Sequence, residues 1–495
     1  MSELLFLRAR LRRRDRWDAR RITAHQERAL GDLRHAAYAG SEFYRRHHAG
    51  LYDAPLEMLP AVTKTDLMNN FDQTVNAPGL RLADVEDHLR ALLATDADPG
   101  MPWRQRWWVA ATSGTTGRRG IFVWDRSEWA TVLASYARAN EWAGIPVRLT
   151  RPLRVGMVSS RVPTHQSAVV GASLGSRFVP TLRLDATSPL SETVAALNDF
   201  QPLLLVGYAS VLRTLAAEQR AGRLGIVPQS VMSASEVLSD QAAAEMSAAW
   251  GSAPFDVYAA TETAGIASPC SFHNRHIYED LVIVEPVDEA GTTVPAGTVG
   301  ARLLVTVLFS RTLPLIRYEM SDRVSVGGRG CPCGRSFSLL TGIEGRVEDV
   351  LLLPGRKGLV SIHPNVFHNV LDEVTRAGWQ VIQEPFGLRV LLVGLAPSMS
   401  TETVHTRLVS ALTSASVVGT LVNVQLVETV ERTPLARRRW SERLRNRHDG
   451  PDRVGSWPRL GYAAPRITVN LSGCRYLRCT PHRVRVPCCP TCTCR

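Results

Sequence analysis

The chain has 495 residues, of which 45% are hydrophobic and 21% charged, and its formal net charge at pH 7 is +12. This composition excludes a fibrous or intrinsically disordered protein, and the length predicts more than one domain. No window approaches the ~18 consecutive apolar residues of a membrane-spanning helix, and the apolar stretch at the N-terminus is too short for a signal peptide. We therefore expect a cytoplasmic protein.

The first residues are apolar and basic, with Leu4, Leu5 and Leu7 followed by arginines between residues 8 and 21. Two interpretations fit this pattern. One is a solvated amphipathic helix that packs one face on the protein, and the other is a basic helix that lies on a membrane surface. The pattern favours the first, and we expect no membrane partner.

The positive charge is unevenly distributed. Residues 446–495 contain nine arginines and two aspartates, so the rest of the chain is nearly balanced. Lysine occurs only at Lys64 and Lys357. Basic and aromatic residues are not interleaved in the way that allows bases to stack, and we expect no nucleic-acid partner.

The chain's end differs from the rest. Six of the nine cysteines lie between residues 474 and 494, in a segment rich in Arg, Cys and Pro that has no apolar periodicity. We interpret residues 446–495 as a disordered or even out-of-frame tail without chemistry, with a site for a soft metal as the alternative.

Short apolar runs alternate with helical patterns in the first three-fifths of the chain. The runs at 153–160, 202–210, 229–235 and 255–261 predict buried parallel strands, and helices are expected at 211–222 and 241–251. The first part is therefore predicted to be α/β. Residues 281–289 and 301–309 then read as an antiparallel hairpin with a long, turn-rich loop.

A second domain is expected after residue 346. Strand patterns at 379–384, 388–395 and 422–430, with helices near 364–377 and at 402–414, predict a small α+β domain. The expected division is a large α/β domain of mixed sheets and helices at 1–345, a small mobile α+β domain at 346–445 and the tail at 446–495.

The stretch TSGTTG at 112–117 is typical of a phosphate-binding loop. It offers main-chain N–H groups and hydroxyls, and Arg118 and Arg119 add positive charge. The sequence has neither the GxxxxGK[ST] pattern of a Walker loop nor the GxGxxG pattern of a dinucleotide fold. The loop alone is weak support for a nucleotide site, since flexible surface loops share this composition.

Three further stretches follow in a particular order: YAATE at 258–262, RYEMSD at 317–322 and GRVED at 345–349. Together with TSGTTG they resemble the core motifs of the adenylate-forming superfamily of acyl-CoA synthetases and adenylation domains, over roughly residues 60 to 440. PAVTKTDL at 60–67, HIYED at 276–280 and CPCGR at 331–335 resemble the phenylacetate-CoA ligase branch.

The resemblance implies a site for ATP and Mg²⁺. It assigns Tyr258 to the adenine, Thr261 to the α-phosphate, and Glu262 to Mg²⁺ and catalysis, and a carboxylate is indeed a hard oxygen ligand of the kind that Mg²⁺ prefers. Asp322 would bind the ribose hydroxyls, and Arg346 the ribose or a phosphate. The remaining nucleotide-binding residues implied are Thr112, Ser113, Gly114, Thr115, Thr116, Gly117, Ser235 and Glu236.

The implied reaction joins a carboxylic acid, aryl or short acyl, to ATP and passes the acyl group to a thiol. The family has a catalytic lysine near the end of the small domain, whereas ERTPLARRRW places Arg437 there. Arginine keeps the charge but has a different shape. Two hypotheses therefore stay open: a ligase in which Arg437 replaces the lysine, and a degenerate homologue that binds a nucleotide or acyl-adenylate without efficient turnover. The acceptor is CoA, the phosphopantetheine thiol of an acyl carrier protein, or an amine.

A zinc site is expected beside the hairpin. Cys270 and His276 precede it, and Cys331 and Cys333 follow it, so an antiparallel return would bring four soft or borderline ligands together. Some phenylacetate-CoA ligases carry Cys and His at these places, which supports a structural Zn²⁺. The alternative is that the cysteines are small buried hydrophobic residues and His276 lies in a solvated loop.

Overall fold

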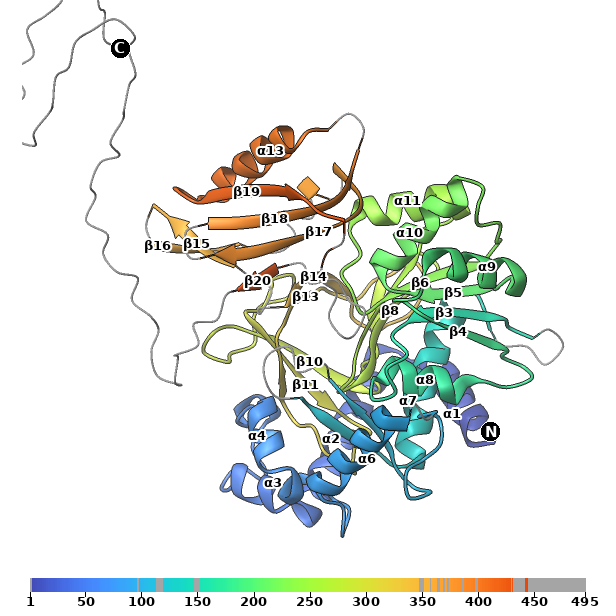
Figure 1. Ribbon diagram of the computed structural model, residues 1–495. Helices are drawn as coiled ribbons and strands as arrows, with labels where there is room; N and C mark the ends of the chain where they lie inside the picture. Colours follow the sequence, from blue (N-terminus) through green and yellow to red (C-terminus); the bar gives the residue numbers. More distant parts are fainter. Residues whose placement is uncertain are drawn as a thin grey trace, which may run out of the picture. The chain divides into compact units, whose positions relative to one another are not determined.

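Contacts between residues divide the chain into two units, 1–444 and 445–495, and the computed structural model describes residues of the first unit only (Figure 1). The described residues are 2–95, 98–112, 119–146, 152–346, 351–356, 358–362, 366–367, 370–371, 374–384, 387–396, 399–428, 430 and 441–443. The predicted tail at 446–495 lies outside them.

The N-terminal part is helical. Its elements are α1 (Ser2–Arg14), α2 (Ala19–Gly40), α3 (Glu42–His47), the 3-10 turn η1 (Leu56–Met58), α4 (Lys64–Asn69), α5 (Phe71–Thr74) and α6 (Leu82–Thr95). Leu7 and Leu11 of α1 are buried, and α1 packs against α7 (Arg126–Trp142), whereas the Phe6 side chain is 67% exposed. The helix thus packs one face on the protein, as the favoured interpretation predicted.

A two-stranded hairpin precedes α7. Strand β1 (Trp108–Ala111) pairs antiparallel with β2 (Ile121–Trp124), and nearly all of their residues are buried. Helix α7 follows directly because Asp125 and Glu128 form a capping box, in which each side chain accepts a hydrogen bond from the other's main-chain N–H.

The predicted parallel strands form one seven-stranded sheet, in the order β4-β3-β5-β6-β7-β8-β9. Its strands are β3 (Val155–Ser159), β4 (Thr181–Asp185), β5 (Leu204–Gly207), β6 (Ser230–Ala234), β7 (Phe255–Ala260), β8 (Ala264–Pro269) and β9 (Arg275–Ile277). The first five in this order are parallel, and β8 and β9 are added antiparallel. The crossover helices are α8 (Gln166–Leu174), α9 (Leu190–Phe200), α10 (Ala209–Arg220) and α11 (Asp240–Trp250).

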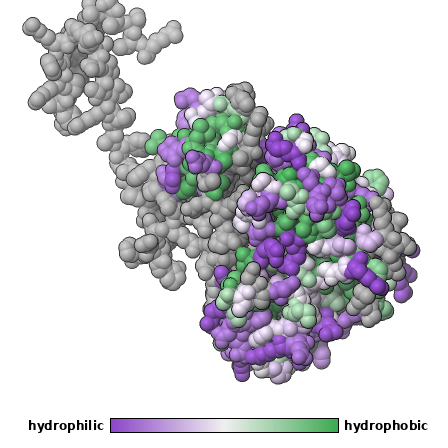
Figure 2. All heavy atoms as spheres, turned by 45° about the vertical axis from the view of Figure 1, so that its right-hand side comes forward, coloured by the Kyte–Doolittle hydropathy of each residue, from purple (hydrophilic) through white to green (hydrophobic). Residues whose placement is uncertain are grey.

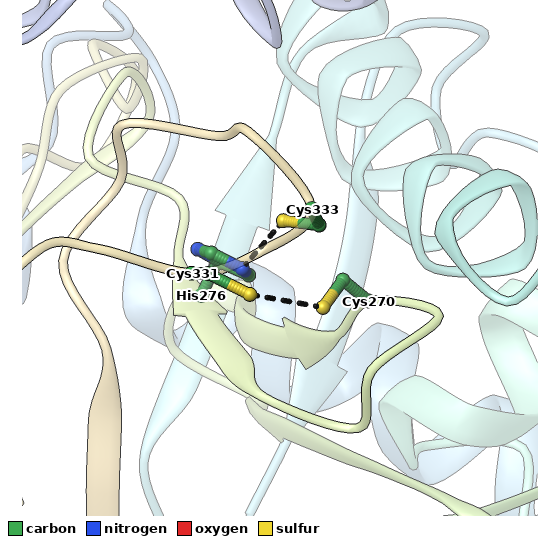
Figure 3. Close-up of side chains that lie close together, drawn as sticks. All are labelled: Cys270, His276, Cys331 and Cys333. Carbon is green, nitrogen blue, oxygen red and sulfur yellow. Dashed lines mark hydrogen bonds between the residues drawn. The ribbon is translucent and has the colours of Figure 1, made fainter.

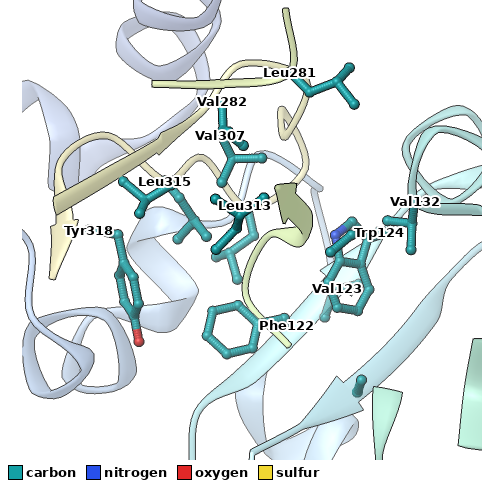
Figure 4. Packing of buried hydrophobic residues seen from close by; sticks show 14 of the residues in the cluster. Phe122, Val123, Trp124, Val132, Leu281, Val282, Val307, Leu313, Leu315 and Tyr318 are labelled. Carbon is teal, nitrogen blue, oxygen red and sulfur yellow. The ribbon is translucent and has the colours of Figure 1, made fainter. Parts of the chain in front are cut away.

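Both faces of this sheet are buried, which explains why its strands read as continuous apolar runs. Side chains alternate between the faces. Leu205 and Val231 belong to one buried cluster with the helices α10 and α11, and Leu204 and Met232 belong to another with α7. A third cluster joins the N-terminal helices to the β1–β2 hairpin and the strands after residue 280 (Figure 4).

The hairpin expected after residue 281 is present. Strand β10 (Val282–Val287) pairs antiparallel with β11 (Arg302–Val307), which pairs with β12 (Tyr318–Met320). The strands β13 (Asp322–Val326) and β14 (Leu340–Arg346) then form a separate antiparallel pair. Hydrophilic side chains are spread over much of the face drawn in Figure 2, with hydrophobic ones between them. None of the described helices has the length and apolarity that crossing a bilayer requires.

The residues after 350 form a small α+β arrangement with a sheet and a buried cluster of their own, in agreement with the predicted fold class. A four-stranded sheet has the order β19-β18-β17-β20, beside the hairpin of β15 (Leu351–Gly355) and β16 (Gly358–Ile362). The sheet contains β17 (Thr375–Glu384), β18 (Gly387–Leu395), β19 (Leu421–Leu426) and β20 (Ser441–Arg443). Helix α13 (Thr401–Ser414) buries Val404, Leu408 and Leu412, which lie four residues apart and so on one face.

Two boundaries in this part were predicted wrongly. The strand expected at 422–430 is β19, which ends at Leu426. The helix expected near 364–377 does not reach residue 377, because strand β17 begins at Thr375, where it already pairs with Leu395. An irregularity between Thr375 and Gly378 interrupts the alternation of side chains at the start of the strand, which hides the strand pattern in the sequence.

Candidate functional site

The predicted phosphate-binding stretch lies in the turn of the β1–β2 hairpin. Thr112 closes this turn, because its main-chain N–H donates to the Gly120 carbonyl and its hydroxyl accepts from the Gly120 N–H, both at 2.8 Å. A side chain at Gly120 would clash, since an added Cβ would lie 2.9 Å from the Phe122 ring. Ser113, Gly114, Thr115, Thr116 and Gly117 lie outside the described residues.

Four of the predicted site residues follow two neighbouring strands of the large sheet. Ser235 and Glu236 come directly after β6, and Thr261 and Glu262 come directly after β7. Because parallel strands end at the same edge of a sheet, these residues share one edge, which is where ligands bind in open α/β sheets. Ser235 has a left-handed φ of 70°, so the chain turns sharply there.

Glu236 is anchored by helix α10, which follows the neighbouring strand β5. One of its carboxylate oxygens accepts a hydrogen bond from the main-chain N–H of Ser210 in α10, at 2.9 Å. Its other oxygen is buried and has no hydrogen-bond partner in the described part of the chain. Tyr258 lies on β7, 9% exposed, three residues before Thr261.

A short segment connects this edge to the β1–β2 hairpin. The carbonyl of Thr164 accepts a hydrogen bond from the N–H of Ala111 at 2.7 Å, immediately before Thr112. Two residues later the Gln166 amide donates to the carbonyl of Thr261 at 3.1 Å. The sequence analysis missed Gln166, since nothing in the pattern PTHQ marks it.

Asp322 and Arg346 come together although 24 positions separate them in the sequence. Asp322 begins β13 and is 9% exposed, and in the register of the two strands it lies opposite Arg346, the last residue of β14. The structure describes the position of Arg346 in the strand but not its side chain, and Arg437 lies outside the described residues.

The predicted metal ligands form a cluster (Figure 3). The ligand atoms of Cys270, His276, Cys331 and Cys333 all lie within 4.8 Å of one another. The sulfur atoms of Cys270 and Cys331 are 3.6 Å apart, and the Cys333 sulfur is 3.2 Å from Nε2 of His276. His276 and the first two cysteines are buried, which contradicts the alternative of a solvated histidine.

Hydrogen bonds around the cluster orient its members. Nδ1 of His276 lies 3.2 Å from the carbonyl oxygen of Phe337, and because a carbonyl can only accept, Nδ1 carries the proton and Nε2 turns a lone pair toward the sulfurs. Asn274 donates its side-chain N–H to the Cys331 sulfur at 3.3 Å, and the Phe272 N–H donates to the Cys270 sulfur at 3.4 Å.

Burial is the largest influence on the pKa values of His276, Cys270 and Cys331. It lowers the pKa of His276, which keeps the imidazole neutral, and it raises the pKa of the Cys270 thiol to about 11. At Cys331 burial also raises the pKa, but hydrogen bonds from the Cys333 main chain and the Asn274 side chain, together with those shared with the Cys333 and Cys270 thiols, outweigh burial and lower the pKa of this thiol. A cation beside the sulfurs would favour their thiolate forms.

Comparisons of the sequence with known proteins give one result without a match and one relative. No protein-family model matches the chain. The phenylacetate-coenzyme A ligase of Thermus thermophilus is 26% identical over 373 residues, which cover 71% of this chain and 75% of that protein.

Solved structures of 2-hydroxyisobutyryl-CoA ligase share the fold. The structure in the postadenylation state, in complex with R3-HIB-AMP, has a TM-score of 0.66 at 19% identity and covers 88% of this chain and 92% of its own. An open conformation with 2-HIB-AMP and CoA has a TM-score of 0.55 at 19% identity, with coverages of 87% and 93%. The chain is therefore similar in sequence to a phenylacetate-coenzyme A ligase, and it has the fold of 2-hydroxyisobutyryl-CoA ligase.

Proposed function

We propose that the protein activates a carboxylic acid, aryl or short acyl, with ATP and transfers the acyl group to the thiol of CoA. The observation that supports this proposal is a pair of hydrogen bonds, from Ala111 to Thr164 and from Gln166 to Thr261, which connects the β1–β2 turn to the end of β7. Thr112 follows Ala111, Glu262 follows Thr261, and Glu236 follows the neighbouring strand β6. The similarity to a phenylacetate-CoA ligase supports the same reaction.

In the first step a carboxylate oxygen attacks the α-phosphorus of ATP, and the bond to the β-phosphate oxygen breaks to release pyrophosphate. In the second step the thiol sulfur attacks the acyl carbon, and AMP leaves. Neither step needs a nucleophilic side chain. The protein's part is to hold the reactants in line and to place positive charge and N–H groups where negative charge develops.

The residues at the sheet edge suit a nucleotide. Thr112 and the Gly120 main chain would flank the phosphates, and Glu262 offers a carboxylate for Mg²⁺, whose charge would offset that of the phosphates. We assign Tyr258 to the adenine and Asp322, with Arg346, to the ribose; Asp322 lies opposite Arg346 in the strand register, which supports this assignment. Ser235, at its left-handed turn, and Glu236 would complete the wall of the pocket.

The Cys₃His cluster suits a structural zinc ion. Tetrahedral Zn–S bonds of about 2.3 Å place two sulfurs about 3.8 Å apart, and the Cys270 and Cys331 sulfurs are 3.6 Å apart. Four protein ligands leave no position for water, so the metal would hold the strand after Glu262 to the segment before β14 and take no part in the reaction.

Arg437 favours a second candidate function. If its planar guanidinium cannot take the place of the family's lysine, the protein binds ATP or an acyl-adenylate without efficient turnover. Loss of one preorganised charge donor costs about 10² to 10³ in rate. By resemblance to the adenylate-forming superfamily, we also propose that the small domain at 346–445 rotates about the GRVED motif, with Glu348 or Asp349 as the pivot. The thiol of an acyl carrier protein is the alternative acceptor to CoA.

The test is pyrophosphate release from ATP and Mg²⁺ across a panel of aryl and short acyl acids, for the wild type and for Arg437→Lys. Release by the wild type supports the ligase. Release by Arg437→Lys alone, with ATP raising the melting temperature of both proteins, supports the degenerate homologue. If neither protein released pyrophosphate and ATP left both melting temperatures unchanged, both functions would be contradicted.

A further inference from the structure

The hydroxyl group of Tyr318 is buried without a hydrogen-bond partner. Tyr318 begins the short strand β12 and is 1% exposed, and its hydroxyl oxygen has no partner in the described part of the chain. An unpaired buried hydroxyl lowers the stability of the folded state, and buried tyrosines therefore usually form a hydrogen bond through this group.

Two other buried tyrosines of this protein follow that rule. The Tyr44 hydroxyl donates to the Pro314 carbonyl at 2.9 Å and accepts from the Ile316 N–H at 3.1 Å. The Tyr278 hydroxyl donates to the Ser268 hydroxyl at 2.7 Å. The fold thus satisfies these tyrosines from its own chain, which makes the unsatisfied Tyr318 hydroxyl a candidate for binding something else.

Tyr318 lies beside the candidate nucleotide site. Its ring meets that of Phe122 edge to face, with centroids 6.0 Å apart, and Phe122 is the second residue after Gly120, where the β1–β2 turn ends (Figure 4). Burial raises the pKa of the Tyr318 hydroxyl, and the negative charge of Glu262 raises it further. Tyr318 is also four residues before Asp322.

The chemistry of the missing partner follows from these neighbours. The phenol stays protonated, so it has a proton to donate. The partner has to be a hydrogen-bond acceptor, and one that arrives with its own positive counterion is favoured beside the negative charge of Glu262. A phosphoryl oxygen of Mg–ATP meets both requirements, and a donor held away from water binds such an oxygen strongly.

We propose that the Tyr318 hydroxyl donates a hydrogen bond to a phosphoryl oxygen of Mg–ATP. This makes Tyr318 a nucleotide-binding residue in addition to Thr261 and Glu262, and the inference rests on the proposed function. The nucleotide would supply an acceptor that the described part of the chain does not offer to this hydroxyl.

The test compares Tyr318→Phe with Tyr44→Phe, which remove one hydroxyl each from a buried ring. The readouts are the melting temperature without ligand and the dissociation constant for ATP in excess Mg²⁺, measured by calorimetry on the full chain. Tyr318→Phe is expected to melt at or above the wild-type temperature, because it removes an unpaired group, and to bind ATP about tenfold or more weakly. Tyr44→Phe is expected to melt lower and to bind ATP as the wild type does.

Three results would overturn the proposal. If Tyr318→Phe bound ATP within twofold of the wild-type affinity, the proposed contact with a phosphate would be contradicted. A fall in melting temperature like that of Tyr44→Phe would mean that the hydroxyl has a partner within the protein. A raised KM for the acid with unchanged ATP affinity would place the hydroxyl at the acid. If the wild type itself did not bind ATP, the proposed function would fail as well, so the two failures are distinguishable.

Discussion

The side-chain amide of Gln166 donates a hydrogen bond to the main-chain carbonyl of Thr261, with the two atoms 3.1 Å apart. Gln166 is 6% exposed, and its own carbonyl oxygen accepts from the Tyr136 hydroxyl at 3.0 Å. The main-chain carbonyl of Thr164 accepts a hydrogen bond from the N–H of Ala111 at the end of β1, so residues 164–166 connect the end of β7 to the β1–β2 turn.

We predict that Gln166→Met slows pyrophosphate release about tenfold. Methionine keeps the length of the side chain but removes the hydrogen bonds to the Thr261 carbonyl and from the Tyr136 hydroxyl. If Thr261 then shifts and the activation free energy rises by about 1.4 kcal/mol, the rate falls about tenfold. The measurement is kcat for pyrophosphate release at saturating ATP and acid.

The control for Gln166→Met is Gln201→Met, which also removes amide hydrogen bonds to two main-chain carbonyls, those of Asn198 and Gly225, away from the sheet edge. We expect a lower melting temperature in both variants and a lower kcat only in the first. Equal loss of kcat in both would mean that Gln166 acts through general stability.

For the metal cluster we predict one zinc per chain that depends on Cys331. The protein for this measurement is the full chain with the six tail cysteines replaced by serine, so that they cannot bind metal. Metal analysis is expected to find one zinc in this protein and none after Cys331→Ser, and chelation should lower the melting temperature because the ion joins segments far apart in the sequence. Zinc near zero in both proteins would contradict the prediction.

A milder variant separates the metal from its surroundings. Asn274→Ala leaves all four ligands but removes the hydrogen bond to the Cys331 sulfur. Partners of this kind tune affinity, so we expect zinc to bind about 10- to 100-fold more weakly at unchanged stoichiometry.

The sequence predicted the parts of the fold that have a strong local period. The parallel strands appear as apolar runs because both sheet faces are buried, and the structure places β3, β5, β6 and β7 within the predicted ranges. β4 was missed, since all five of its residues are only partly buried and its sequence TLRLD mixes charged and apolar residues.

The candidate site was predicted from motifs and spacing, and its unpredicted residues are those that act through tertiary contacts. The return of the chain after residue 281 was enough to bring Cys331 and Cys333 to His276. The roles of Gln166 and of the Tyr318 hydroxyl, which has no partner among the described residues, could not be predicted from the sequence. Each depends on which group, distant in the sequence, lies opposite the side chain.

We predict that His48 makes the protein sensitive to acid. Its side chain is fully buried among Tyr38 and Tyr44, with Nδ1 bonded to the Tyr38 hydroxyl at 3.1 Å, and burial lowers its pKa from 6.5 to about 4. The folded state therefore holds His48 neutral while the unfolded state binds a proton below pH 6.5. The free energy of unfolding is therefore unaffected by this histidine above pH 6.5. As the pH falls from 6.5 toward 4, protonation of His48 in the unfolded state lowers the free energy of unfolding by at most about 3 kcal/mol.

The variant that tests this is His48→Asn, which cannot be protonated. It should be less stable than wild type at pH 7.5, because it packs less well, and the difference in melting temperature should shrink as the pH falls from 6.5 to 4.5. His35→Asn, at an exposed position of α2, is the control and should follow the wild type at every pH. A constant difference for His48→Asn would show that another group carries the acid sensitivity.

The last prediction concerns the pairing of Asp322 with Arg346 across β13 and β14. Asp322 begins β13 opposite Arg346, the last residue of β14, and is 9% exposed; we propose that its carboxylate binds the ribose of ATP. ATP with Mg²⁺ should raise the melting temperature of the wild type, by the equivalent of about 2.7 kcal/mol when the nucleotide is at 100 times its dissociation constant. Asp322→Ala should remove most of this shift.

The matched control is Asp288→Ala, which deletes a carboxylate that accepts a hydrogen bond from the Thr292 N–H in the β10–β11 loop. This variant should have a lower melting temperature without ligand but should keep the shift that ATP causes. If Asp322→Ala kept the shift too, the nucleotide would not be bound through Asp322, whereas a wild type that ATP at millimolar concentration does not stabilise would contradict the nucleotide site as a whole.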